Sequence, residues 1–237
     1  MMDTLSNNEM RMIRSLREKK FRDELGLFTV EGEKMVAELA DSGLETVMIV
    51  RREDVGEKVM ERISSCNTPS PVLAVVRKPA PASHSASGLC LALDSVRDPG
   101  NMGTILRLAD WFGLDCVFAS PDSVEVFNPK VVQASMGAIF RKKLIYCDIA
   151  AKCKEFRAAG LEVFGTFLNG DNIYEASLPA EGLIVLGNES NGISNAVASE
   201  CSRRLTIPTF GGGAESLNVS VAAAITVSEF KGHGGWK

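Results

Sequence analysis

Residues 89–113, LCLALDSVRDPGNMGTILRLADWFG, run from a short apolar segment through a Pro-Gly turn into apolar residues at helical spacing. The unbroken apolar segment 89–93 is typical of a strand that is buried on both faces. After the turn at residues 98–100, Asn101 is expected at the N-cap of a helix over 102–112, where its side chain can accept a backbone N–H. This stretch predicts a strand–turn–helix unit, which is the building block of α/β sheets.

The same alternation of strands and helices continues through the second part of the chain. Further strands are expected at 116–119, 144–146, 163–167, 183–186 and 205–207. The intervening helices are expected at 129–140, 149–159, 194–200 and 217–230. Short apolar strands that are separated by helices favour an α/β fold with a mostly parallel sheet, covered on both faces.

A stretch rich in Pro, Ala, Ser and Gly, KPAPASHSASG at 78–88, has the composition of a linker. We therefore expect a small α/β domain at 1–80, a linker at 81–88 and a larger α/β domain at 89–237. In the first domain the expected helices are 7–20, 32–41 and 54–64, and the expected strands are 46–50 and 72–76.

The charge balance restricts how the chain can bind nucleic acid. Its 237 residues carry 26 Lys and Arg against 30 Asp and Glu, so the net charge is −4. This balance excludes a globally basic nucleic-acid binder but not a local basic patch. One such cluster consists of Arg11, Arg14, Arg17, Lys19, Lys20 and Arg22. We expect such a cluster to make local phosphate contacts with a modest dependence on salt, although most basic clusters are only solvated surface.

Cysteine and histidine usage argues against several kinds of chemistry. The six cysteines form no CxxC pair and several lie in apolar runs, which predicts buried reduced thiols and no metal site. Only two histidines are present, and neither has a serine or cysteine partner nearby in sequence, which disfavours a Ser-His-Asp triad. Without a long apolar run or a signal peptide, the chain is expected to be cytoplasmic, with no membrane partner.

Two further segments carry polar residues directly after predicted strands. In IVLGNESNGIS at 184–194, Gly187 permits close backbone approach, and Asn188 and Glu189 follow at the carboxyl end of the strand. In IPTFGGGAESLNVSVAAAI at 207–225, three glycines predict a bent or flexible loop before a helix. Each segment alone is also what an ordinary strand exit needs. None has the GxGxxG pattern of a dinucleotide-binding oxidoreductase, which disfavours that alternative.

Together, and in this order, DPGNMGTILRLADWFG at 98–113 and these two segments resemble the SpoU (TrmH) family of RNA methyltransferases in the SPOUT superfamily. The intervening NPKVVQASMGA at 128–138 is also similar, although many members carry Arg where this chain has Gln133. The resemblance covers roughly residues 90–230. The first 80 residues are similar, less specifically, to a substrate-binding domain that often precedes the catalytic domain.

The resemblance implies an S-adenosylmethionine-dependent RNA methyltransferase with a C-terminal trefoil knot, acting as a homodimer without a metal. Its reaction would be 2′-O-ribose methylation. The substrate would then be an RNA, either rRNA or tRNA, because the 2′-hydroxyl distinguishes RNA from DNA. The implied catalytic residues are Asn101, Arg107, Glu189, Ser216 and Asn218. The implied cofactor-binding residues are Thr166, Phe167, Leu168, Leu186, Gly187, Asn188, Ile207 and Leu217.

The roles of these residues follow from the needs of methyl transfer to a hydroxyl. Arg107 would stabilise negative charge on the ribose oxygen or hold a phosphate, with base action left open. Glu189 would orient Arg107 or Asn101, and Ser216 and Asn218 would place the nucleotide. A non-catalytic RNA-binding protein with a vestigial cofactor site is the alternative, and the presence of all five residues disfavours it.

Overall fold

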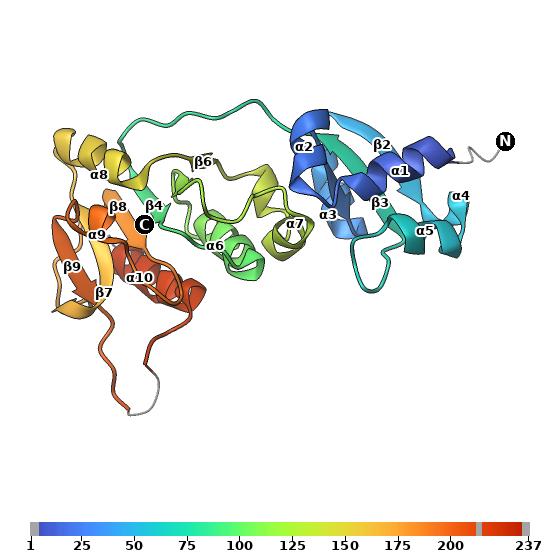
Figure 1. Ribbon diagram of the computed structural model, residues 1–237. Helices are drawn as coiled ribbons and strands as arrows, with labels where there is room; N and C mark the ends of the chain where they lie inside the picture. The colour runs from blue at the N-terminus through green and yellow to red at the C-terminus, as the bar shows by residue number, and fades with distance from the viewer. Residues whose placement is uncertain (1–4, 212–214, 234–237) are drawn as a thin grey trace. The chain divides into compact units, whose positions relative to one another are not determined.

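The computed structural model describes residues 5–211 and 215–233, which form two compact units (Figure 1). One unit contains the residues up to Ala80 together with Glu125–Arg141, and the other contains the rest. The first unit's main segment ends at Ala80, as expected, but the residues expected to form the linker, 81–88, belong to the second unit. The other difference from the expected boundaries is the segment Glu125–Arg141, which lies between two strands of the second unit in sequence but packs with the first.

The first unit is a three-stranded antiparallel sheet covered by helices on both faces. Its strands lie in the order β1-β3-β2 and are β1 (Leu27–Glu31), β2 (Thr46–Arg51) and β3 (Val72–Arg77). Its helices are α1 (Asn7–Ser15), α2 (Lys19–Leu25), α3 (Glu33–Ala40), α4 (Arg52–Val55), α5 (Glu57–Ile63), α7 (Pro129–Ser135) and the 3₁₀ helix η1 (Ala138–Phe140). Successive residues of the central strand β3 pack into different core clusters, one with α1 and α5 and the other with α3 and α7.

Local backbone chemistry explains where this unit differs from expectation. The helix expected at 7–20 is two helices, because α1 ends at Ser15, and the side chain of Arg22 binds the carbonyls of Leu16 and Arg17 just beyond it. The helix expected at 54–64 is interrupted by Gly56, whose φ of 82° is incompatible with a right-handed helix. The fully buried strand β1 was not predicted at all.

The second unit is built on a six-stranded sheet in which every neighbouring pair of strands is parallel, in the order β6-β5-β4-β8-β7-β9. The strands are β4 (Leu89–Leu93), β5 (Val117–Ala119), β6 (Leu144–Tyr146), β7 (Val163–Asn172), β8 (Gly182–Leu186) and β9 (Arg203–Thr206). The helices are α6 (Pro99–Trp111), α8 (Ile149–Ala158), α9 (Asn195–Ala198) and α10 (Val219–His233). This architecture confirms the predicted mostly parallel α/β sheet, whereas strand order does not test the knot, which stays a prediction.

Helix α6 begins earlier than predicted, and its N-cap is Asp98 rather than Asn101. The Asp98 carboxylate accepts the backbone N–H of Asn101 at 2.8 Å, and Pro99 occupies the first helical position, where its missing N–H costs nothing. The prediction that Asn101 caps the helix is therefore wrong. Its side chain is instead available for hydrogen bonds to other residues.

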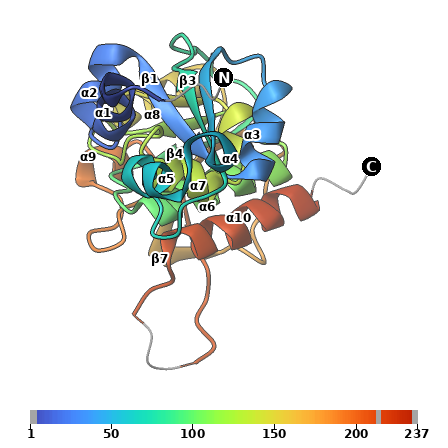
Figure 2. The ribbon, with the colours of Figure 1, turned by 90° about the vertical axis from the view of Figure 1, so that its right-hand side faces the viewer.

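Figure 2 shows α10, which packs on α6, as a long helix at the C-terminal end of the chain.

The buried cysteines of the second unit are not reactive thiolates. Cys90, Cys116 and Cys153 are buried in the core cluster of the second unit, as predicted, whereas the other three cysteines, Cys66, Cys147 and Cys201, are only partly buried. Burial raises the pKa of Cys90 and of Cys153 to about 12 and that of Cys116 to about 11. These thiols therefore stay protonated at neutral pH.

In the described parts of both units, no helix is long and apolar enough to cross a bilayer.

A buried ion pair holds the segment Glu125–Arg141 in the first unit. Arg22 is only 1% exposed, and its Nη2 and Nε donate to Oε2 of Glu125 at 2.6 and 2.9 Å. The other Oε atom of Glu125 lies 3.4 Å from Nζ of Lys78. Because Nη1 of Arg22 also donates to the two helix-end carbonyls, the buried guanidinium is well satisfied.

Replacing Glu125 by Ala should destabilise the first unit strongly, because it leaves the guanidinium of Arg22 buried without its countercharge. We expect a loss of about 3 kcal/mol in the free energy of unfolding, measured by urea denaturation. Glu45→Ala is the matched control, because it breaks the solvent-exposed pair with Arg77 and should change stability little. Equal losses in the two variants would contradict a structural role for the buried pair.

Candidate active site

Polar side chains gather at the edge of the second sheet where β4 and β8 end. Because neighbouring strands are parallel, their carboxyl ends meet at one edge, which is where open α/β sheets bind ligands. The turn after β8 carries Asn188 and Glu189, and the segment after β4 leads into α6 and Asn101. The sheet thus places residues that are far apart in the sequence within hydrogen-bonding distance.

Asn101 is the centre of this arrangement. Its Nδ2 donates to Oε1 of Glu189 at 2.8 Å, and its Oδ1 accepts from Nδ2 of Asn218 at 3.0 Å. An ionised carboxylate can only accept hydrogen bonds, so Glu189 fixes which way the Asn101 amide is turned. The Asn101 oxygen must then face Asn218, and Asn218 must act as the donor. Three predicted catalytic residues are therefore brought together, as one directed chain of hydrogen bonds.

The same chain of bonds fixes the start of α10. Because Asn218 donates through its nitrogen, its Oδ1 is left to accept from the backbone N–H and the hydroxyl of Ser220, at 2.9 and 2.6 Å. Asn218 thereby caps α10 while it contacts Asn101. The amide of Asn218 thus links the first turn of α10 to Asn101 in the site.

The turn that carries Glu189 is shaped by its neighbours Gly187 and Asn188. A Cβ on Gly187 would lie 2.1 Å from the backbone carbonyl carbon of Gly192, so only glycine fits there. The Oδ1 of Asn188 accepts backbone N–H groups within the turn, and its Nδ2 donates to the carbonyl oxygen of Ser95 at 2.8 Å. The turn is therefore rigid and tied to the segment that follows β4.

Ser95 adopts a backbone conformation that is uncommon for a residue with a side chain. Its φ is 61°, which costs free energy outside glycine and is often found at functional sites. Its N–H donates to the hydroxyl of Ser120, and its own hydroxyl donates to Asp122. Hydrogen bonds from Ser95 and Ser120, with Arg97 nearby, lower the pKa of Asp122 to about 2. The carboxylate therefore stays charged and keeps Ser95 in place.

Strand β7 contains an irregular loop at residues 167–170 that is held from the side by Arg204. The pairing of β7 with β9 shifts between Thr166 and Asp171, so residues 167–170 leave the regular ladder. The guanidinium of Arg204 lies 3.5 Å from the ring centroid of Phe167, and its Nη2 donates to Oδ1 of Asn169 at 3.0 Å. The sequence analysis assigned no role to Arg204. Its role was not predictable without the loop's conformation.

The other predicted cofactor residues lie on β7 and β8, directly after β9 and shortly before α10. Thr166 donates its hydroxyl to the carbonyl of Val185, which joins β7 to β8. Leu186 is buried and Ile207 half-buried, whereas Leu168 and Leu217 are 80% and 48% exposed. Apolar side chains are therefore left open to solvent where β7, β8 and β9 end. Two of the three glycines in the predicted bent loop lie outside the described residues.

Two predicted catalytic residues stand apart from the network. Arg107 is exposed on α6, six residues after Asn101, which turns its side chain about 120° around the helix axis. Neither the side chain of Arg107 nor that of Ser216 forms a hydrogen bond or ion pair with another residue of the described structure. Gln133 is likewise exposed, on α7. Among the described residues, no three His, Cys, Asp or Glu side chains gather as metal ligands would.

Residues 88–228 match the model of the SpoU rRNA methylase family, and residues 7–55 match that of the MRM3-like substrate binding domain. The first match spans more than half of the chain and includes all three predicted motifs. The chain belongs to the SpoU rRNA methylase family. The resemblance seen in the motifs is thereby confirmed, and the second unit is a SPOUT methyltransferase domain.

Relatives of this SpoU-family chain match it over nearly its whole length. It is 30% identical to the 23S rRNA (guanosine(2553)-2′-O)-methyltransferase RlmP of Bacillus subtilis, over 97% of this chain and 98% of that protein. Among solved structures, a TrmH-family protein from Porphyromonas gingivalis is 42% identical, with a TM-score of 0.87 over 96% and 98% of the two chains. An AdoMet-bound rRNA methyltransferase from Sinorhizobium meliloti is 30% identical, also with a TM-score of 0.87, over 97% and 96%.

Proposed function

We propose that this chain transfers the methyl group of S-adenosylmethionine to a ribose 2′-hydroxyl in 23S ribosomal RNA, in the cytoplasm. The observation that carries the proposal is the Asn101–Glu189–Asn218 network at the carboxyl edge of the sheet. The ribosomal target is favoured over tRNA because RlmP, a 23S rRNA 2′-O-methyltransferase, matches both units of this chain. A vestigial, non-catalytic site would have no need for a directed network of this kind.

The proposed cofactor site consists of the irregular loop within β7 and the segments that follow β8 and β9. Thr166, Phe167 and Leu168 would line one side, with Leu186, Gly187 and Asn188 opposite and Ile207 and Leu217 closing the site. The exposed leucines fit the flat apolar face of an adenine, and the loop backbone offers polar groups for its edge. S-adenosylmethionine supplies a methyl group that is already activated by a positively charged sulfonium.

The ribose hydroxyl is a poor nucleophile, so the protein must align it and stabilise the charge that develops on its oxygen. A guanidinium stays protonated in proteins, and we therefore assign charge stabilisation on the ribose oxygen and an adjacent phosphate to Arg107. Alignment in a site that is fixed before the substrate binds supplies much of the rate. Glu189, itself exposed, and the free hydroxyl of Ser216 would position the nucleotide.

The position of Arg107 favours a homodimer. Trp111 lies one turn further along the same face of α6 and is 86% exposed, and Val221 is exposed on α10, which packs on α6. Large apolar side chains exposed on two helices that pack together are typical of an interface. We propose that a second copy covers this face, so that Arg107 acts on the nucleotide held at the partner copy's Asn101 network.

Replacing Arg107 by Ala should abolish methyl transfer to ribosomal RNA while S-adenosylmethionine binding persists, because the guanidinium acts on the ribose and not on the cofactor. The checks are transfer of a labelled methyl group and calorimetric titration with the cofactor. Arg157→Ala, which removes an exposed arginine paired with Glu200, should retain activity. Loss of cofactor binding by a folded Arg107→Ala protein would overturn the assigned role.

Replacing Arg204 by Ala should weaken cofactor binding by about tenfold, because the loop at residues 167–170 loses both its stacking partner and its hydrogen bond. The KM for S-adenosylmethionine should rise while kcat changes little, and Arg204→Lys should restore part of the affinity. Arg203→Ala is the matched control on the same strand, because Arg203 pairs with Asp171 instead. If both alanine variants behave alike, Arg204 does not position the loop.

A further inference from the structure

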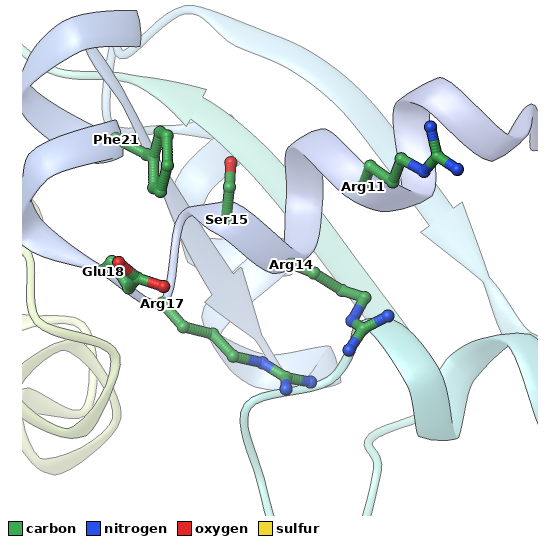
Figure 3. A pocket seen from close by; sticks show the side chains of 6 residues that line it. All are labelled: Arg11, Arg14, Ser15, Arg17, Glu18 and Phe21. Carbon is green, nitrogen blue, oxygen red and sulfur yellow. The ribbon is translucent and has the colours of Figure 1, made fainter.

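The first unit contains a hollow of about 320 Å³ between α1 and α2 (Figure 3). The side chains that line it are Arg11, Arg14, Ser15, Arg17, Glu18 and Phe21. Figure 3 shows Arg14 and Arg17 extending to the same side of α1, with the ring of Phe21 at one end of the group. The volume lies at the lower end of the range that is typical of small-ligand sites.

The sequence of α1 explains why this wall is polar and faces outward. Arg11, Arg14 and Ser15 follow the spacing i, i+3 and i+4 on α1, which places them on one helical face. Met10 and Ile13 lie on the other face and pack into the core of the first unit. The arginines are therefore presented by a rigid, well-packed helix.

The positive charge of this wall is not neutralised by nearby carboxylates. Glu9 accepts hydrogen bonds from the N–H of Ser6 in a capping box, and those bonds lower its pKa. Asp23 is paired with Lys19 and Lys78, which lower its pKa to about 2. Glu18 is the single acidic residue that lines the hollow in the described structure. The local field is therefore positive although the chain as a whole is acidic.

The three arginines differ in how far they are free to bind a ligand. Arg17 donates through Nη2 to the carbonyls of Arg62 and Ser64 at the end of α5, so its guanidinium is already held. The side chains of Arg11 and Arg14 form no hydrogen bond or ion pair within the described residues. Two unengaged guanidinium groups, one turn apart on a helix, are suited to successive phosphates of a backbone.

Phe21 adds a second, independent feature that points to nucleic acid. Its ring is half-buried, and Nζ of Lys20 lies 5.7 Å from the ring centroid. Aromatic side chains beside basic ones bind single-stranded nucleic acid, because unpaired bases stack on the ring while the backbone meets the cations. A duplex offers no free base face for such stacking.

We propose that this hollow binds an unpaired nucleotide of the RNA substrate, with flanking phosphates on Arg11 and Arg14 and the base stacked on Phe21. This inference rests on the proposed function, since it names how the same RNA is held outside the methyl-transfer site. It also explains how an acidic protein binds RNA, through a few local contacts and not through net charge.

The test compares the full-length Arg11→Ala/Arg14→Ala variant with Arg51→Ala/Lys58→Ala, which removes two exposed positive charges elsewhere in the same unit. Binding is measured by fluorescence anisotropy with a short single-stranded oligoribonucleotide and with a duplex. The pocket variant should bind single strands at least tenfold more weakly, and the slope of log K against log salt should fall by about 1.4. The control variant should lose clearly less affinity for single strands than the pocket variant.

Phe21→Leu and Phe21→Trp separate stacking from charge. The leucine variant should weaken single-strand binding about tenfold without changing the salt slope, and the tryptophan variant should retain affinity. For ribosomal RNA, KM should rise in the pocket variants while kcat and cofactor affinity stay unchanged. If the wild-type protein transfers no methyl group, the proposed function is wrong. The anisotropy comparison still shows whether the hollow binds single-stranded RNA. Equal effects of pocket and control variants, or equal loss for duplex RNA, would overturn this inference.

Discussion

The hydrogen bond from the Asn101 amide to the Glu189 carboxylate is the interaction on which the site depends. A carboxylate can only accept, so it sets the orientation of the amide, and the amide in turn makes Asn218 a donor. The oxygen of Asn218 is then committed to capping α10. One carboxylate thus orders three segments that lie far apart in the sequence, before any substrate binds.

The parallel sheet makes this interaction possible, because it brings the ends of β4 and β8 to a common edge. The strained backbone of Ser95 and the glycine at 187 also contribute, since both let the turns after β4 and β8 approach closely. The first unit has a different organisation, with an antiparallel sheet and the inserted segment Glu125–Arg141 held by a buried ion pair. Because that segment lies between β5 and β6 in sequence, the two units are joined by more than the linker.

Much of the fold could be predicted from the sequence, because apolar strands and helical spacing are local signals. All six strands of the second sheet and the motif residues Asn101, Glu189 and Asn218 were identified in this way or by family resemblance. One failure was local: the helix begins three residues earlier than predicted, so Asp98 caps it by accepting the N–H of Asn101. The other failures depended on tertiary structure, and the role of Arg204 depends on a loop that no periodicity describes. The packing of Glu125 against Arg22 joins residues that are 103 positions apart, beyond any local pattern.

The central claim is that this network serves methyl transfer to a ribose of 23S ribosomal RNA. The most direct test is to map 2′-O-methylation in ribosomal RNA and tRNA from cells with and without the gene, and from cells that carry Glu189→Ala. The account predicts that one ribose methyl group of 23S rRNA disappears in the deletion strain and that the Glu189 variant does not restore it. Loss of a methylated base, loss of a tRNA modification, or an unchanged methylation map would contradict the account.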